Sequence, residues 1–451
     1  MLQVMMERAM REALSEGADQ VEVFGVSSRT LSVYLDDSAL KNVEEKLDRG
    51  ISVRLARGRR LGEASTTLRG RGDVERCVAD ALGGTRVSQP DPDFQGFPSG
   101  GGDLPGEPEP LDMGDLVESM DLLVSACHEE GPVKVPTGML RAATVRSMVI
   151  NSNGGETGQQ GPLTYGHVTS MTTDGSRGEG VERFYFPSPE ELDFASLGAS
   201  LGRKAVDSGR AETFQGKEAL PVFLPPHQLA EMLLHSVGFA VSGENVLYRR
   251  SPWTGKMGER IASRELTVMD DPTRPGMLSA PADDEGVPSS RKELIRDGEL
   301  RSFLYDSYNA GKAGAEPTGN ALRRSASASQ GLYRNPVGIS PMNLVLGPGE
   351  KGPEDLIGSF DRALLVERFS HPEINPITGG FALEVRCAHI LEHGESTRTV
   401  RHALLVGNMY SALGNLAGVA DDARMFGPTV VPTAGFHGME LVGLGPGEGD
   451  R

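Results

Sequence analysis

The chain has 451 residues, 38% hydrophobic and 24% charged, which is the composition of a globular protein of two or three domains. Its net charge of −18 has the same sign as nucleic acids and anionic membranes, so the sequence predicts that it binds neither. The three cysteines are widely spaced and form no CxxC pair, which indicates reduced thiols in a cytoplasm rather than a disulfide framework.

The N-terminal part, residues 1–84, predicts a small antiparallel sheet between two helices. Apolar side chains recur at helical spacing in 1–17 and again in 72–83. Between these helices, alternating segments such as 21–24 and 31–35, separated by Gly-containing turns, predict four strands.

A second α/β unit is expected at residues 111–214. Residues 85–110 come before it, are rich in Pro, Gly and Asp, and predict a linker or a surface loop. Helices at 111–130 and 189–208 enclose three predicted strands, and a turn at 151–155 starts the first connection between them.

Residues 219–451 predict the largest unit, a β-rich C-terminal domain. A short apolar strand at 221–224 ends at two prolines, and a helix at 227–241 follows. Strands and Gly turns then dominate. The whole chain is therefore predicted to be α+β: a helix-flanked antiparallel sheet, a second α/β unit and a β-rich C-terminal domain.

His235, on the predicted helix, is the first candidate for chemistry. Hydrolysis by bound zinc needs about three protein ligands, an open position and a base for the water. Ser236 follows His235 directly, and Phe239 and Ala240 lie one turn later, so one imidazole stands alone. We interpret His235 either as a polar residue that contacts a neighbour, or as a relict ligand position or a contact to substrate or partner.

A second candidate is the group of Cys387, His389 and His393. Alternate residues of a strand point to one face, so Cys387 and His389 are expected to converge. His393 precedes Gly394 in a predicted hairpin tip, where histidine is common. A buried thiol beside the core is the simpler interpretation of Cys387, and a zinc site made by the three residues is the alternative.

Three polar turns supply the remaining candidates for lining a substrate or partner site. The acidic run 283–286 lacks the ligand spacing of an EF-hand loop and is expected to be a solvated turn. The other two turns contain glycines that permit close backbone approach, and they would form ordinary hairpins or hold an extended peptide by strand addition. The candidate residues are Asp284, Glu285, Thr318, Gly319, Asn320, Asn375, Thr378 and Gly379.

Taken in order, several segments resemble the TldD/PmbA (TldE) family. The resemblance extends over about residues 230–445, and the N-terminal helix-sheet unit resembles the first domain of that family. No single motif is decisive, and the order and spacing of the segments make the resemblance specific. The matching segments are Pro281–Pro288, Leu294–Leu300, Asn309–Gly314, Pro317–Ala321, Asn375–Phe381, Ile390–Glu395 and Val406–Asn408.

The resemblance implies an intracellular proteolytic complex of two related subunits that degrades peptides or trims peptide precursors. In that family TldD binds zinc through two histidines of an HExxxH helix and a cysteine near the C-terminus. His235 aligns near the first of these histidines, but no Glu follows it, no second His is present, and 426–444 contain no Cys. The resemblance thus implies a metal-free TldE/PmbA-like subunit without catalytic residues or a cofactor of its own, in a heterodimer with a zinc-binding TldD-like partner.

Two other functions stay open from the sequence. One is a peptide-binding modulator that acts as a homodimer without proteolysis. The other is a self-sufficient metallopeptidase with a non-standard site built from Cys387, His389 and His393.

Overall fold

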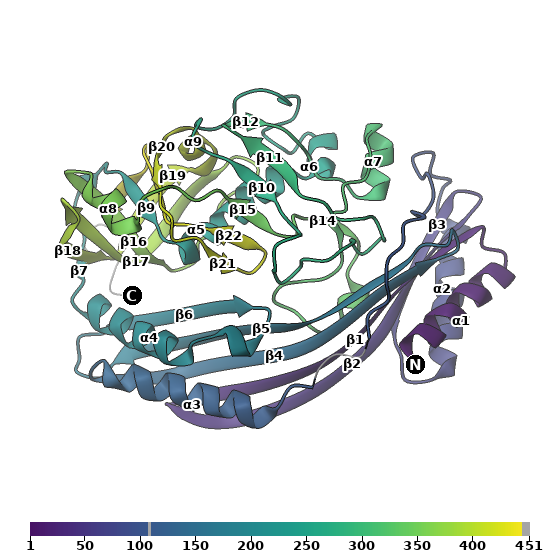
Figure 1. Ribbon diagram of the computed structural model, residues 1–451, viewed down its shortest axis with the longest axis horizontal. Coiled ribbons are helices and arrows are strands. Elements are labelled where there is room, and N and C mark those ends of the chain that lie inside the picture. Colours follow the sequence, from purple (N-terminus) through teal and green to yellow (C-terminus); the bar gives the residue numbers. More distant parts are fainter. Residues whose placement is uncertain (107–109, 444–451) are drawn as a thin grey trace.

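A long, curved antiparallel sheet forms one layer of the molecule, and the C-terminal half lies on its concave side (Figure 1). The computed structural model describes residues 1–106 and 110–443. Residues 107–109 of the predicted linker and 444–451 of the predicted C-terminal domain lie outside that description.

Six strands make up the long sheet. In sheet order they are β3 (Arg60–Thr67), β2 (Ala39–Arg57), β1 (Gln20–Asp36), β4 (Val133–Asn151), β5 (Glu156–Thr172) and β6 (Glu179–Phe186). The units predicted at 1–84 and 111–214 share this sheet, because β1 pairs with β4 from Glu22–Asn151 to Asp36–Thr137. Segments 21–24 and 31–35, predicted as separate strands, both belong to β1, which pairs continuously on both sides.

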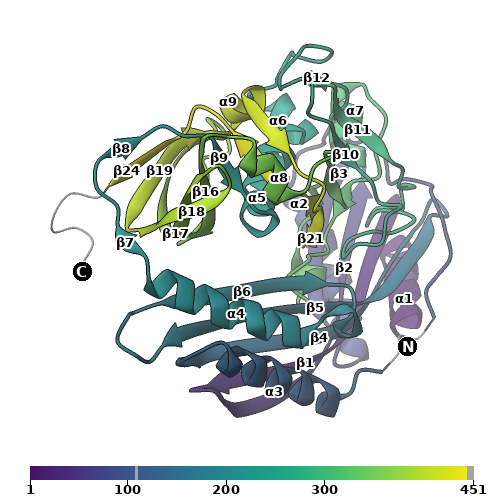
Figure 2. The same ribbon diagram turned by 60° about the vertical axis from the view of Figure 1, so that its left-hand side comes forward.

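Two pairs of helices cover the convex face of the sheet (Figure 2). Helices α1 (Leu2–Ser15) and α2 (Arg71–Val87) bury Met6, Ala9 and Val78 against one end of it. Gly25 of β1 makes room for this packing, because a Cβ there would lie 2.4 Å from Met6 Sδ. Helices α3 (Met113–Glu129) and α4 (Phe194–Gly209) bury a second apolar cluster at the other end.

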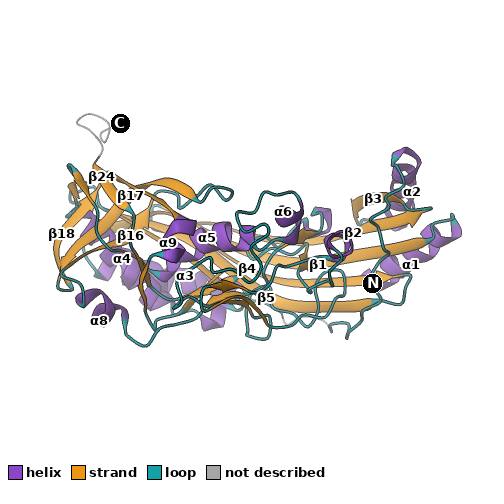
Figure 3. Cartoon of the chain, turned by 90° about the horizontal axis from the view of Figure 1, so that it is seen from above, coloured by secondary structure: helices purple, strands orange, loops and turns teal. Residues whose placement is uncertain are grey.

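The C-terminal half contains the other sheets and the largest apolar core. One sheet has the order β12-β11-β10-β15-β22-β21, and another has the order β20-β23-β9-β16-β17-β19-β24-β8, with β18 and β7 paired beside it. Buried aliphatic and aromatic side chains fill the space between these sheets and helix α5 (Pro226–Leu233). Seen from above, the long sheet extends well beyond this half and carries α1 and α2 at its far end (Figure 3).

The remaining elements are mostly short. The strands are β7 (Glu212–Thr213), β8 (Lys217–Glu218), β9 (Val222–Leu224), β10 (Val268–Asp270), β11 (Lys292–Arg296), β12 (Glu299–Leu300), β13 (Ala321–Leu322), β14 (Gly338–Ile339), β15 (Leu344–Leu346), β16 (Arg362–Phe369), β17 (Gly380–Glu392), β18 (Glu395–Arg401), β19 (Ala403–Asn408), β20 (Leu416–Val419), β21 (Arg424–Phe426), β22 (Thr429–Val431), β23 (Ala434–Phe436) and β24 (Glu440–Gly443). The helical segments are η1 (Pro189–Glu191), the π-helical η2 (Leu234–Gly238), α6 (Gly243–Leu247), α7 (Ser307–Ala313), η3 (Leu332–Arg334), α8 (Pro353–Gly358) and α9 (Met409–Gly414).

The predicted α+β class is confirmed by this mixture of helices and largely antiparallel sheets. All three cysteines are free and buried. Within 1–106 and 110–443, none of the helices combines the length and apolar character that crossing a bilayer requires.

Candidate functional site

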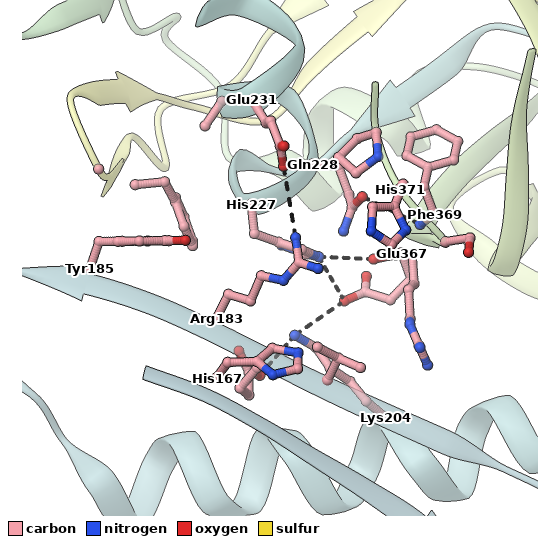
Figure 4. A pocket seen from close by; sticks show the side chains of 18 of the residues that line it. His167, Arg183, Tyr185, Lys204, His227, Gln228, Glu231, Glu367, Phe369 and His371 are labelled. Carbon is pink, nitrogen blue, oxygen red and sulfur yellow. Dashed lines mark hydrogen bonds and ion pairs between the residues drawn. The ribbon is translucent and has the colours of Figure 1, made fainter. Parts of the chain in front are cut away.

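A cavity of about 790 Å³ lies where the two halves of the molecule face each other. Strands β5 and β6 and helix α4 supply one wall, and α5 with the end of β16 and the middle of β17 supplies the other (Figure 4). Because β6 is the last strand of the long sheet, the cavity lies along that edge.

A chain of charged side chains crosses from one wall to the other. The Lys204 ammonium of α4 lies 2.8 Å from Glu182 Oε1 on β6 and 3.8 Å from Glu367 Oε1 on β16. His227, in the first turn of α5, completes the chain through its Nε2, which lies 2.8 Å from the Glu367 carbonyl oxygen and 3.7 Å from its carboxylate. The shared lysine therefore connects the N-terminal sheet to the C-terminal half at the base of the cavity.

Two histidines of the cavity, His227 and His167, are biased toward the neutral form. Burial lowers the pKa of His227, and the neighbouring Lys204 lowers it further, against the opposing effect of Glu367. Burial also lowers the pKa of His167 on β5, with smaller contributions from Arg183 and Arg368. Neutral imidazoles at neutral pH can donate and accept hydrogen bonds without adding charge to the cavity.

Nearer the opening, the walls carry loosely paired charges. Arg183 of β6 and Glu231 of α5 face each other across the cavity at 3.8 Å, and both are about two-fifths exposed. Tyr185 lies beside Arg183 on the same strand (Figure 4). Charges of both signs and an aromatic ring along a strand edge provide partners for a peptide backbone and for its charged groups.

His235 lies where this cavity meets a second one. Helix α5 passes at Leu234 into one π-helical turn, and both Leu234 and His235 line the large cavity and an adjoining one of about 400 Å³. The expected helix at 227–241 thus contains a π-helical segment, a feature found frequently at functional sites. His235 is exposed at this junction.

The residues that follow His235 do not supply metal ligands to the cavity. Ser236 is fully buried, and its hydroxyl donates to the Met232 carbonyl oxygen at 2.7 Å. Phe239 lines the smaller cavity with its apolar ring. The positions that follow His235 thus present neither a base nor a second ligand to the cleft, and the carboxylate one turn earlier, Glu231, faces Arg183.

Cys387 and His389 both line the large cavity, which agrees with their placement on one face of β17. Burial raises the pKa of the Cys387 thiol to about 12, which disfavours the thiolate that zinc would need. His389 Nδ1 is within 3.3 Å of the Ser396 and Thr399 hydroxyls. His393 lies at the exposed tip of the β17–β18 hairpin with a positive φ of 50° and does not join them.

These observations bear on zinc, the metal expected in the resembling family. In the described part of the chain, His, Cys, Asp and Glu side chains form no group of three arranged to hold a metal ion. Together with the buried Ser236 and the protonated Cys387, this donor set does not fit a zinc site.

The acidic run 283–286 is buried, and the expectation of a solvated turn was wrong. Asp284 accepts hydrogen bonds from the backbone N–H groups of Arg323 and Arg324 and pairs with the Arg324 guanidinium at 2.7 Å. Glu285 pairs with Arg54 of β2 at 2.7 Å and accepts from Ser307. Arginines from distant segments neutralise Asp284 and Glu285, while Asp283 accepts hydrogen bonds from the backbone N–H groups of Glu285, Val287 and Ala321, and these contacts allow the run to pack between the halves.

The turn at 318–320 is also structural in its contacts. Asn320 is fully buried and donates to Asp270 Oδ2 at 2.6 Å, while Thr318 donates to Asn320 Oδ1 at 2.9 Å. Gly319 has a φ of 71°, and a Cβ there would lie 2.5 Å from the Pro288 carbonyl oxygen. None of the three lines the large cavity.

The turn at 375–379 lies at the surface near the smaller cavity, which Pro376 helps to line. Asn375 Oδ1 accepts from the N–H of Thr378 at 3.0 Å, and Gly379 has a φ of 76°. Tyr410 connects this turn to the π-helical segment, since its hydroxyl lies 2.5 Å from the Pro376 carbonyl oxygen and 3.1 Å from that of Ser236.

Sequence reasoning missed the charged chain at the base of the cavity. Its members come from α4, α5, β6 and β16, and no short spacing joins Glu182, Lys204 and Glu367. His227 had a detectable signal, because it precedes His235 by eight residues and therefore lies on a similar face of the same predicted helix.

Comparison with known proteins agrees with this architecture. Residues 217–443 match the model of the PmbA/TldA metallopeptidase C-terminal domain, and residues 21–83 match that of PmbA/TldA metallopeptidase domain 1. The crystal structure of TldE from Thermococcus kodakarensis superposes with a TM-score of 0.86 at 24% identity, and the alignment covers 97% of this chain and 100% of that one.

Two curated relatives align over most of their length. A metalloprotease of Methanothermobacter thermautotrophicus is 26% identical over 91% of this chain and 90% of its own. A metalloprotease TldD homolog of Haemophilus influenzae is 24% identical over 90% of this chain and 86% of its own.

Proposed function

Because the chain belongs to the PmbA/TldD metallopeptidase family, we propose that it is the metal-free, TldE-like subunit of a two-subunit peptidase. In this proposal it binds an extended peptide in the cleft and positions it for a zinc-binding, TldD-like partner in the cytoplasm. The observation that carries the proposal concerns the helix at 226–238: it presents His227, Glu231 and His235 to the cleft, and in the described part of the chain these side chains belong to no group of three His, Cys, Asp or Glu arranged to hold a metal ion.

Peptide is the substrate class that the cleft supports best. An extended chain needs backbone partners along its length and pockets for alternate side chains. The edge of β6 lines the cavity, and Arg183, Glu231 and Tyr185 stand at its opening. The partner would gain from such a wall, because a held peptide loses less freedom on reaching the transition state.

The test compares three preparations: this chain, a TldD-like chain from the same cell, and an equimolar mixture. Zinc is measured on each chain by mass spectrometry, and cleavage of an unstructured peptide is followed with time. We expect zinc on the partner only and cleavage by the mixture at a rate well above that of either chain. Stoichiometric zinc and cleavage with this chain alone would instead support the self-sufficient metallopeptidase.

Two variants test whether the cleft binds the peptide. Arg183→Glu should raise KM for the peptide by about tenfold with kcat little changed, since it removes a binding contact and adds a carboxylate next to Glu231. Arg210→Glu is the matched control, because Arg210 lies at the end of α4, is about three-quarters exposed and does not line the cavity. Peptide binding by the isolated chain without any cleavage in the mixture would favour the homodimeric modulator.

A further inference from the structure

The first half of β2, residues 39–48, leaves its outer edge without a strand partner. β3 pairs with β2 only from Gly50 to Arg57, and none of the described strands other than β1 pairs with 39–48. Most of these residues are exposed on both faces of the sheet. A long open edge of this kind exposes a row of N–H and C=O groups that can bind another strand.

An apolar stripe runs along this edge. Leu40, Val43 and Leu47 are 46%, 45% and 77% exposed, and they are among the large apolar side chains that the molecule leaves open. Val43 lies opposite Val33 of β1, and Leu40 lies opposite Leu35. Val33 and Leu35 belong to the core under α3, so the stripe continues that core to the edge of the sheet.

The edge is complementary to a second copy of itself. When two such edges pair antiparallel with Glu45 on the two-fold axis, Val43 lies opposite Leu47 of the other copy. Glu44 then lies opposite Lys46 of the other copy, and symmetry repeats each pair. Within one chain Lys46 and Glu44 already form an ion pair at 2.8 Å, so the four charges would alternate in sign.

The charge of Glu45, the residue on the two-fold axis, is also balanced within each copy. Glu45 pairs with Arg29 of β1 at 2.7 Å, so two copies would bring together two carboxylates and two guanidinium groups. We propose that two copies of this chain associate through residues 39–48, β2 against antiparallel β2, and join their long sheets into one.

This association goes beyond the proposed function and does not compete with it. Sheet order places β2 and β6 toward opposite edges, and Figure 1 shows β6 next to the C-terminal half and the purple strands along the far margin. A self-associated pair would therefore leave the cleft open to a different partner and to peptide.

The test is analytical ultracentrifugation of the full chain and of charge variants, at matched concentrations. Glu44→Lys and Lys46→Glu each place two like-charged pairs across the axis, so each should raise the dissociation constant of the dimer by about tenfold. The double variant Glu44→Lys/Lys46→Glu restores opposite charges in every pair and should recover the dimer. Glu265→Lys and Arg264→Glu, on exposed residues of the C-terminal half, are the matched controls.

Mixing the two single variants gives the sharpest result. A Glu44→Lys chain carries two lysines and a Lys46→Glu chain two glutamates, so the mixture should form a heterodimer more tightly than either variant forms a homodimer. Circular dichroism confirms that each variant is folded. A monomeric native chain, a dimer that the single reversals leave unchanged, or a double variant that stays monomeric would each overturn the proposal, as would pairing of this edge with a TldD-like chain only.

Discussion

Arg54 should be the most costly single charge to remove from the interface between the two halves. Its guanidinium lies 2.8 Å from Glu22 Oε1 on β1 and 2.7 Å from Glu285 Oε1 in the C-terminal half. Both carboxylates are almost fully buried. Arg54→Met keeps most of the side-chain volume and leaves two buried carboxylates with weaker partners.

The size of the stability loss in Arg54→Met depends on the hydrogen-bond and ion-pair partners that each carboxylate keeps. Glu22 retains Arg323 Nη2 at 3.2 Å, and Glu285 retains the Ser307 N–H and hydroxyl at 2.9 and 2.6 Å. Removing one partner of a buried ion pair costs about 3–5 kcal/mol, because the remaining charge is left without compensation. We therefore expect about 3 kcal/mol of lost stability at pH 8, toward the lower end of that range.

The loss should depend on pH in a defined direction. In the native chain burial opposes ionisation of Glu285, but Arg54 and Ser307 outweigh it and hold its pKa below the ordinary value. Its contribution to stability is therefore present above the unfolded-state pKa and is lost as the pH falls through the lower folded-state pKa. Without Arg54, burial would raise the pKa of Glu285, and the variant would regain stability by binding a proton. The difference between native and variant should shrink from pH 8 to pH 5.

Urea unfolding followed by two probes measures this effect. Trp253, the single tryptophan, is buried in the C-terminal half and reports on that half, whereas far-UV circular dichroism reports on all strands. Native transitions should coincide, and those of Arg54→Met should separate if the ion network couples the halves. Arg210→Met is the control, since its exposed pair with Asp207 should contribute less than about 1 kcal/mol. A loss below about 1 kcal/mol at pH 8, or a loss that does not change with pH, would refute this reasoning.

Three further substitutions test individual contacts by urea unfolding. Gly379→Ala should cost about 2–3 kcal/mol of stability, because φ is 76° and a Cβ would lie 2.4 Å from Tyr410 Cδ2. Gly438 also has a positive φ but open space around it, so Gly438→Ala should cost only about 1 kcal/mol. Equal losses would show that the contact with Tyr410 contributes nothing. Asn320→Ala should cost about 3 kcal/mol by removing a donor from the buried Asp270, and a loss below 1 kcal/mol would show that this hydrogen bond is dispensable. Burial lowers the pKa of His227, so its contribution to the stability of the fold is complete above the unfolded-state value of 6.5 and falls as the pH drops through the folded-state pKa. His227→Gln should therefore lose less stability than the native chain between pH 7.5 and 5. Equal losses in the two chains would show that protonation of this imidazole does not cause the pH dependence.

Local periodicity was sufficient to predict the helices and many strands. Leu116, Met120, Leu123 and Val124 share one face of α3, and all four are buried in the structure. Pairing between distant strands was not predictable, because the register of β1 against β4 depends on a partner more than a hundred residues away. The N-terminal and second units therefore looked separate although they share one sheet.

The prediction for the acidic run was wrong for a related reason. Three acidic residues followed by a glycine, Asp283 to Gly286, predict a solvated turn when only their neighbours are considered. Their partners Arg54 and Arg324 come from another half or another loop, and Arg54 precedes Glu285 by 231 positions. Composition gives the number of charges but does not say which of them meet.

The helix at 226–238 explains why the chain can keep a cleft without a metal-ligand set. Ser236 points inward, is fully buried and returns its hydrogen bond to Met232, so a glutamate in its place would bury a carboxylate in the core rather than present it to the cavity. The cleft itself depends on other residues, because Lys204 connects its walls through Glu367. In the described part of the chain, the absence of a ligand set beside His235 is thus a property of the packing of this helix as well as of its sequence, and the walls of the cleft are stabilised independently of it.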